Sequence, residues 1–200
     1  MLDFLAALAR LFLRPNFDRR RFRVDQNGML RGLSLTYVGR DDIPYGKSAS
    51  AMRQPYAGLV AHHPASHPSW SVQQLIDLTL SPRGAREVYY GYHFIIDVDG
   101  TIYQTAPLTK RTNHIKDKLN RQVDGATLTN RNALGLCFHL ASHNPDMAPT
   151  KAQREAGKRL VQALRQLFGA LPIYGHGEIQ TDKHPSEGRA FARFIRSNLK

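Results

Sequence analysis

Short apolar runs of strand length recur along the chain and are separated by turn residues. Asp99-Gly100 stands between two of these runs, and this dipeptide is a strong signal for a β-hairpin. Runs of this length with β-branched and aromatic residues are typical of buried strands. The pattern therefore predicts five strands, over residues 56–61, 92–97, 101–104, 133–140 and 171–174.

Three other segments have the 3.6-residue periodicity of amphipathic helices. Ser71 can cap a helix over 72–80, with Gln74 at the third position of a capping box. The longest helix is expected over 151–168 and is ended by Gly169, and a last helix is expected over 189–199. Helices that alternate with strands indicate an α/β fold, with a central mixed β-sheet flanked by helices.

The chain divides by composition into two parts. Its 200 residues and 42% hydrophobic content suit one packed domain with additional chain. Residues 1–50 form an arginine-rich extension whose first 13 residues have the pattern of a short amphipathic helix. This helix is expected to dock on the body of the protein or to contact an anionic membrane surface. The compact domain is expected over 55–197.

The net charge of +12 predicts attraction to polyanions such as nucleic acid or an anionic cell envelope. The arginines are scattered, and no aromatic-basic motif of a nucleic-acid module occurs, so no nucleic-acid partner is expected. The single cysteine, Cys137, excludes an internal disulfide and is expected to be a buried, inert thiol. Because a basic n-region and a cleavage site are missing from its start, we expect the chain to be cytoplasmic when it is synthesised.

Histidines stand at the ends of two predicted strands. His62 and His63 follow the first strand, His176 follows the last, and His184 comes eight residues later. A catalytic zinc ion takes three protein ligands and keeps one position open for water. Histidines from two chain-distant loops can supply such a set, although this spacing by itself is weak evidence for a metal.

The motifs taken together resemble the type-2 N-acetylmuramoyl-L-alanine amidase family, which includes peptidoglycan-recognition proteins and phage lysozyme-type amidases. The resemblance covers about residues 55–197, and the Tyr-His-Phe-x-Ile block near residue 92 is its most specific part. It implies a peptidoglycan-recognition-protein-like amidase fold. It also implies zinc-dependent hydrolysis of the bond between N-acetylmuramic acid and L-alanine. The matching segments are 59–66, 91–104, 132–136 and 175–179.

The resemblance assigns the zinc ligands by position. His62 and His176 match the first two ligands of the family. The third is a cysteine or aspartate in the family, and a gapless match places His184 there. A site of three histidines still binds zinc and keeps a water. Asp182 is the alternative third ligand.

Further residues acquire roles from the same resemblance. Tyr92 matches the catalytic tyrosine, which orients the attacking water or the substrate carbonyl. Cys137 stands where part of the family has a glutamate base. Lys183 is one residue from the expected catalytic lysine and would stabilise the developing oxyanion. His63, His114 and Asn132 are expected to contact the substrate.

Alternative functions remain open at this point. A catalytically inactive peptidoglycan-binding module would keep the groove and lack a third ligand. A nucleic-acid-binding protein is supported by the charge alone. For an active enzyme, the missing signal and the basic surface favour a phage-type endolysin that acts in the periplasm or at the cell wall. Recycling of muropeptides in the cytoplasm and a toxin delivered into a competitor are the other settings.

Overall fold

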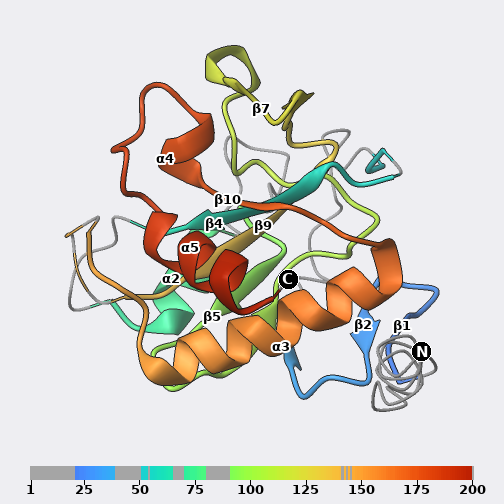
Figure 1. Ribbon diagram of the computed structural model, residues 1–200. Helices are drawn as coiled ribbons and strands as arrows, with labels where there is room; N and C mark the ends of the chain where they lie inside the picture. Colours follow the sequence, from blue (N-terminus) through green and yellow to red (C-terminus); the bar gives the residue numbers. More distant parts are fainter. Residues whose placement is uncertain are drawn as a thin grey trace, which may run out of the picture.

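A six-stranded mixed sheet forms the centre of the computed structural model (Figure 1). The structure describes residues 21–38, 51–53, 55–64, 70–79, 91–140, 142, 144 and 146–199. Four neighbouring strands of the sheet are parallel, and the last two run in the opposite direction. The order across the sheet is β10 (Ile173–Gly175), β4 (Gly58–His62), β9 (Ala133–Phe138), β5 (Phe94–Ile96), β6 (Ile102–Gln104) and β3 (Thr36–Tyr37).

The neighbouring inner strands β4 and β9 are buried along their whole length. Parallel strands that are covered on both faces have nearly continuous apolar sequences, as these two do. Side chains alternate between the two faces of each strand. Leu59 and Ala61 therefore face the main core, whereas His62 lies on the opposite face, in register with Cys137 of β9.

Helices cover both faces of the sheet, as the apolar periodicity predicted. The helices α3 (Lys151–Phe168) and α5 (Arg189–Asn198) pack against the main core and against each other (Figure 1). On the other face, α2 (Val72–Thr79) packs through Leu75 and Ile76. Ser71 and Gln74 form the expected reciprocal cap of α2, and Gly169 ends α3 with a φ of 87°.

The sheet and its core extend into the segment that was expected to precede the compact domain. β3 pairs with β6, and Phe22 and Leu30 are buried in the main core. The remaining elements are the hairpins β1 (Arg23–Val24) with β2 (Leu30–Arg31) and β7 (Gln122–Val123) with β8 (Ala126–Thr127), and the short helices η1 (Asp117–Leu119) and α4 (His176–Ile179).

Two points concern the N-terminal helix and possible membrane-spanning helices. The amphipathic helix expected in the first 13 residues lies outside the described residues. Among the helices that the structure describes, none has the length and apolarity needed to cross a bilayer.

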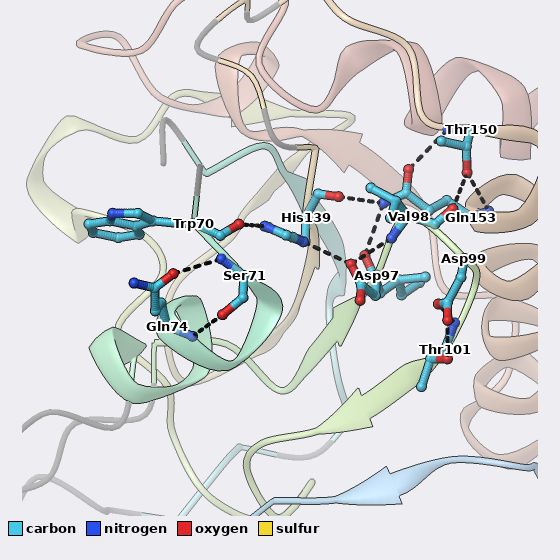
Figure 2. Close-up of polar contacts among 11 residues, drawn as sticks. Trp70, Ser71, Gln74, Asp97, Val98, Asp99, Thr101, His139, Thr150 and Gln153 are labelled. Atoms are coloured by element: carbon cyan, nitrogen blue, oxygen red, sulfur yellow. Dashed lines mark hydrogen bonds and ion pairs between the residues drawn. The ribbon is translucent and has the colours of Figure 1, made fainter. Parts of the chain in front are cut away.

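A buried histidine joins the ends of two strands to α2 (Figure 2). His139 Nδ1 lies 2.8 Å from Asp97 Oδ1, and its Nε2 lies 2.9 Å from the carbonyl oxygen of Trp70. Both partners are acceptors, so the ring is held between the Asp97 carboxylate and the Trp70 carbonyl. Gln153 of α3 donates to the carbonyl oxygens of Ile96 and His139 from the other side.

Replacing His139 with alanine is expected to destabilise the fold by about 2–3 kcal/mol, because the Asp97 carboxylate and the Trp70 carbonyl lose their donor inside the protein. Urea unfolding of the variant against the parent chain measures this loss. His184→Ala is the matched control, because this histidine is exposed and its loss should cost less than about 0.5 kcal/mol. Equal stability of the two variants would contradict the role of His139.

Candidate metal centre

Two buried histidines meet at the carboxyl ends of neighbouring parallel strands. Gly175, the last residue of β10, is in register with Ala61 of β4, so the residue that follows each of them reaches the same edge. These residues are His176 and His62. Their Nδ1 atoms lie 3.0 Å apart, although 114 positions separate the residues in the chain. Such an edge of a parallel sheet is a common place for ligand sites.

Glu187 completes the cluster. Its Oε1 lies 2.7 Å from His176 Nδ1 and 3.8 Å from His62 Nδ1. Gly188 allows this approach, because it has a φ of 72° and packs against the carbonyl of Ala61, where any Cβ would clash. Within the described residues, His62, His176 and Glu187 are the group whose ligand atoms lie near enough to hold a metal ion, all within 4.8 Å of one another.

The electrostatics of the site favour a cation between the Nδ1 atoms of His62 and His176 and the Oε1 atom of Glu187. Burial lowers the pKa of His62 to about 3, aided by the charge of His176 and opposed by Glu187. Burial alone would raise the pKa of Glu187, but hydrogen bonds with His176 and His62 hold it well below the usual range. A neutral imidazole and a carboxylate are the forms that bind metal ions.

The spacing of the cluster fits a tetrahedral zinc site. Zinc bonds to nitrogen and oxygen of about 2.0–2.2 Å place neighbouring ligand atoms roughly 3.3–3.6 Å apart. The three separations in the cluster, 3.0, 2.7 and 3.8 Å, bracket that range. Two histidines and one glutamate also form a known catalytic zinc set.

Hydrogen bonds fix the outer nitrogens of both imidazoles. His62 Nε2 lies 2.9 Å from His114 Nδ1, and His176 Nε2 lies 3.0 Å from Gln180 Oε1. Burial, together with the neighbouring His62 and His93, holds the pKa of His114 well below its usual range, so this histidine is neutral. Both candidate ligand rings are therefore held in place from behind.

Tyr92 lies beside the cluster. Its ring centroid is 5.0 Å from that of His62, and its side chain forms a hydrogen bond with Cys137. Burial raises the pKa of Cys137 well above its usual range. Cys137 is therefore a buried neutral thiol, as expected.

An open groove of about 670 Å³ runs along the cluster. Three basic side chains, Arg111, Lys116 and Lys183, line it together with two acidic ones, Asp117 and Glu187, so that cations outnumber anions by one. Lys183 Nζ lies 3.9 Å from Glu187 Oε2, so its charge is close to the candidate metal position. The other lining residues are Tyr92, Asn113, His114, Ile115, Asn130, His176 and Gln180.

The structure does not bring the expected third ligand to the cluster. His184 is exposed, and its Nδ1 lies 2.6 Å from Ser186 Oγ. Its backbone packs against Gly177, where a Cβ would clash with the His184 carbonyl, and a turn from His184 to Glu187 then places Glu187 in the cluster. Asp182, the alternative ligand, is exposed and forms an ion pair with Lys116 instead.

The residues expected to contact substrate have different positions. Of these, His114 lines the groove. His63 is not among the residues that line this groove; it borders a small cavity that His62 also lines, and its Nε2 lies 2.9 Å from the carbonyl oxygen of Asn144. The side chain of Asn132 accepts hydrogen bonds from Thr129 and donates one to Thr127, so it stabilises a turn.

Sequence reasoning missed Glu187, Gln180 and Asn130. A signal for Glu187 was present, because the family resemblance implied a cysteine or an aspartate as third ligand in the loop after the second histidine, and glutamate is the acidic residue nearest in chemistry to aspartate. Asn130, which is buried, accepts from the main-chain N–H groups of His114 and Ile115 and so shapes the groove wall. Its role depends on contacts that no local motif indicates.

Comparison with known proteins places this geometry in a family. A sequence model described as N-acetylmuramoyl-L-alanine amidase matches residues 52–189. No curated protein matches the chain.

Three solved structures have a similar fold. The endolysin amidase LysCS from Clostridium intestinale is 19% identical, with a TM-score of 0.57, and the alignment covers 84% of this chain and 97% of that one. The Ph2119 endolysin of a Thermus scotoductus bacteriophage is 19% identical, with a TM-score of 0.54 and coverage of 78% and 92%. Human PGRP-Iβ C, solved with glycosamyl muramyl pentapeptide, is 20% identical, with a TM-score of 0.55 and coverage of 80% and 94%. The family match over residues 52–189, on a fold that brings two histidines and a glutamate within reach of one metal ion, shows that the chain belongs to the N-acetylmuramoyl-L-alanine amidase family.

Proposed function

We propose that this protein is a zinc-dependent amidase that hydrolyses the bond between N-acetylmuramic acid and L-alanine in bacterial peptidoglycan. The observation that carries the proposal is the convergence of His62, His176 and Glu187 beside the basic groove. A catalytically inactive binding module would lack a third ligand. Because Glu187 supplies a carboxylate where His184 was expected, the enzyme is favoured over that alternative.

Each residue around the cluster has a chemical task in this proposal. Zinc, when bound, supplies an activated water and polarises the substrate carbonyl. Tyr92 lines the groove next to His62, where its hydroxyl can orient the attacking water or the carbonyl. Lys183 places a positive charge near Glu187, from where it would stabilise a developing oxyanion of the substrate.

The groove suits an anionic muropeptide. Peptide stems carry carboxylates, and the cations of Arg111, Lys116 and Lys183 would attract them. The human relative that was solved with a muramyl pentapeptide supports a ligand of this class. Peptidoglycan or its soluble fragments are therefore the proposed substrates, and the net charge of +12 would also favour contact with the anionic envelope.

We propose a phage-type endolysin as the biological setting, with action at the cell wall. Similarity to two endolysins supports this setting, at 19% identity in each case. The strongly basic composition supports it as well, because a polymeric anionic target benefits from that charge more than small soluble fragments do.

Removal of metal tests the proposed reaction. The purified protein should contain about one zinc ion per chain and release L-alanine-terminated peptides from a muramoyl-peptide. Treatment with a chelator should abolish this release, and added zinc should restore it. Mass spectrometry of the products identifies the bond that is cut. Full amidase activity in metal-free protein would rule out the proposal.

A further inference from the structure

The Gln180 side chain lies behind the metal cluster and is completely buried. Its Oε1 lies 2.7 Å from the main-chain nitrogen of Lys116 and 3.0 Å from His176 Nε2. Its Nε2 donates to Asp182 Oδ1. One amide thus contacts a candidate metal ligand, the wall of the groove and an exposed carboxylate.

These partners fix which end of the amide is oxygen. The main-chain N–H of Lys116 can only donate, so it requires the oxygen. Asp182 is an acceptor, because Lys116 Nζ lies 2.6 Å from its other oxygen, and hydrogen bonds from Lys116 and Gln180 lower the pKa of Asp182. If the amide were flipped, its NH2 group would face the main-chain N–H of Lys116, and its oxygen would face the carboxylate of Asp182. The orientation of Gln180 is therefore determined by its surroundings.

An amide oxygen at this position requires a hydrogen on His176 Nε2. In the neutral imidazole, which is the form that binds a metal ion, the lone pair then lies on Nδ1. This is the atom 3.0 Å from His62 Nδ1 and 2.7 Å from Glu187 Oε1. We propose that Gln180 is a positioning residue that orients His176 and selects Nδ1 as its metal-binding atom. This inference rests on the proposed zinc site and names a residue that sets its ligand geometry.

The other histidine is prepared in the same way. His114 Nε2 lies 3.1 Å from the carbonyl oxygen of Ala133 and must donate to it, so His114 Nδ1 accepts from His62 Nε2. The lone pair of His62 is then on Nδ1 as well. Gly135 gives the His114 ring its space, because a Cβ there would lie 2.8 Å from His114 Cγ. Both imidazoles thus present the same nitrogen to one point.

The first test measures zinc affinity in variants of the full-length protein. Gln180→Met removes the acceptor and should weaken zinc binding about 10- to 100-fold, as loss of an outer partner of a zinc-bound histidine does. The double variant Gln180→Glu with Asp182→Asn exchanges the amide and the carboxylate between the two positions. The carboxylate at position 180 can still accept from His176, and the amide at position 182 can donate to it. It should bind zinc within about threefold of the parent chain. Competition with a chromophoric chelator gives the affinities.

Asp182→Asn alone is the matched control, because an asparagine oxygen can still accept from Gln180. Its zinc affinity should equal that of the parent chain within about threefold. The inference fails if folded Gln180→Met binds zinc as tightly as the parent, or if the double variant is as weak as Gln180→Met.

A second measurement needs no variant. In the zinc-loaded parent protein, proton–nitrogen NMR correlations of the His176 ring should show the hydrogen on Nε2. A hydrogen on Nδ1 would overturn the inference even if zinc is bound. If the parent chain binds no zinc at all, the proposed function fails first, so the two failures are distinguishable.

Discussion

Glu187→Ala is expected to lose zinc and to reduce amidase activity at least 1000-fold, whereas His184→Ala should keep both. Glu187 is the carboxylate that approaches both His62 and His176. Its removal leaves two ligands where a catalytic zinc ion requires three. His184 instead contacts Ser186 at the surface. The experiment measures the zinc content and the turnover of each purified variant.

The pair of variants separates two assignments of the third ligand. A gapless match to the family predicts His184, and the structure places Glu187 in the cluster. Because His184 is exposed, its replacement should leave the fold and the turnover within about twofold of the parent. Loss of zinc in His184→Ala with retention in Glu187→Ala would reverse the assignment.

Gly188→Ala is expected to destabilise the fold by about 3 kcal/mol or more and to weaken metal binding. Gly188 has a φ of 72°, a conformation that costs alanine about 1 kcal/mol, and its added Cβ would clash with the main-chain carbonyl of Ala61. Backbone must move to relieve that clash, and the adjacent Glu187 must move with it. Thermal or urea unfolding and a zinc titration measure the two effects.

Gly125→Ala is the matched control, because it measures the cost of a left-handed backbone at alanine without a steric clash. Gly125 has a φ of 78°, almost the same as that of Gly188, but a Cβ there would have no neighbour within 4 Å. It should therefore lose only about 1 kcal/mol and keep full zinc affinity. If both variants lost the same stability, the contact between Gly188 and Ala61 would have no energetic importance.

The part of the site that could be predicted from the sequence is the pair of histidines that follow two predicted strands. Residues 56–61 and 171–174 were expected to be strands, and the histidines that follow them were expected to meet. Parallel pairing of β4 with β10 brings them together as expected. Tyr92 and His114 were found through the family resemblance and lie in the groove.

The third member of the cluster could not be predicted in the same way. Its identity depends on the turn from His184 to Glu187 and on the left-handed Gly188, and a gapless comparison cannot represent a longer loop. Gln180 was missed because its partner Lys116 is 64 positions away and no local motif records that contact. Strand β3 was missed because it has two residues and gains its stability from β6.

The order of the donors along the chain has a consequence for biosynthesis. His62 is in the first third of the polypeptide, whereas His176 and Glu187 both follow residue 170. β10, which delivers His176, is an edge strand that adds to β4. During synthesis, the growing chain therefore has only one of the three donors until residue 176 is made, and all three only after residue 187. Metal binding at this cluster should therefore follow the pairing of β10 with β4, because His62 alone cannot supply the three ligands of a catalytic zinc site.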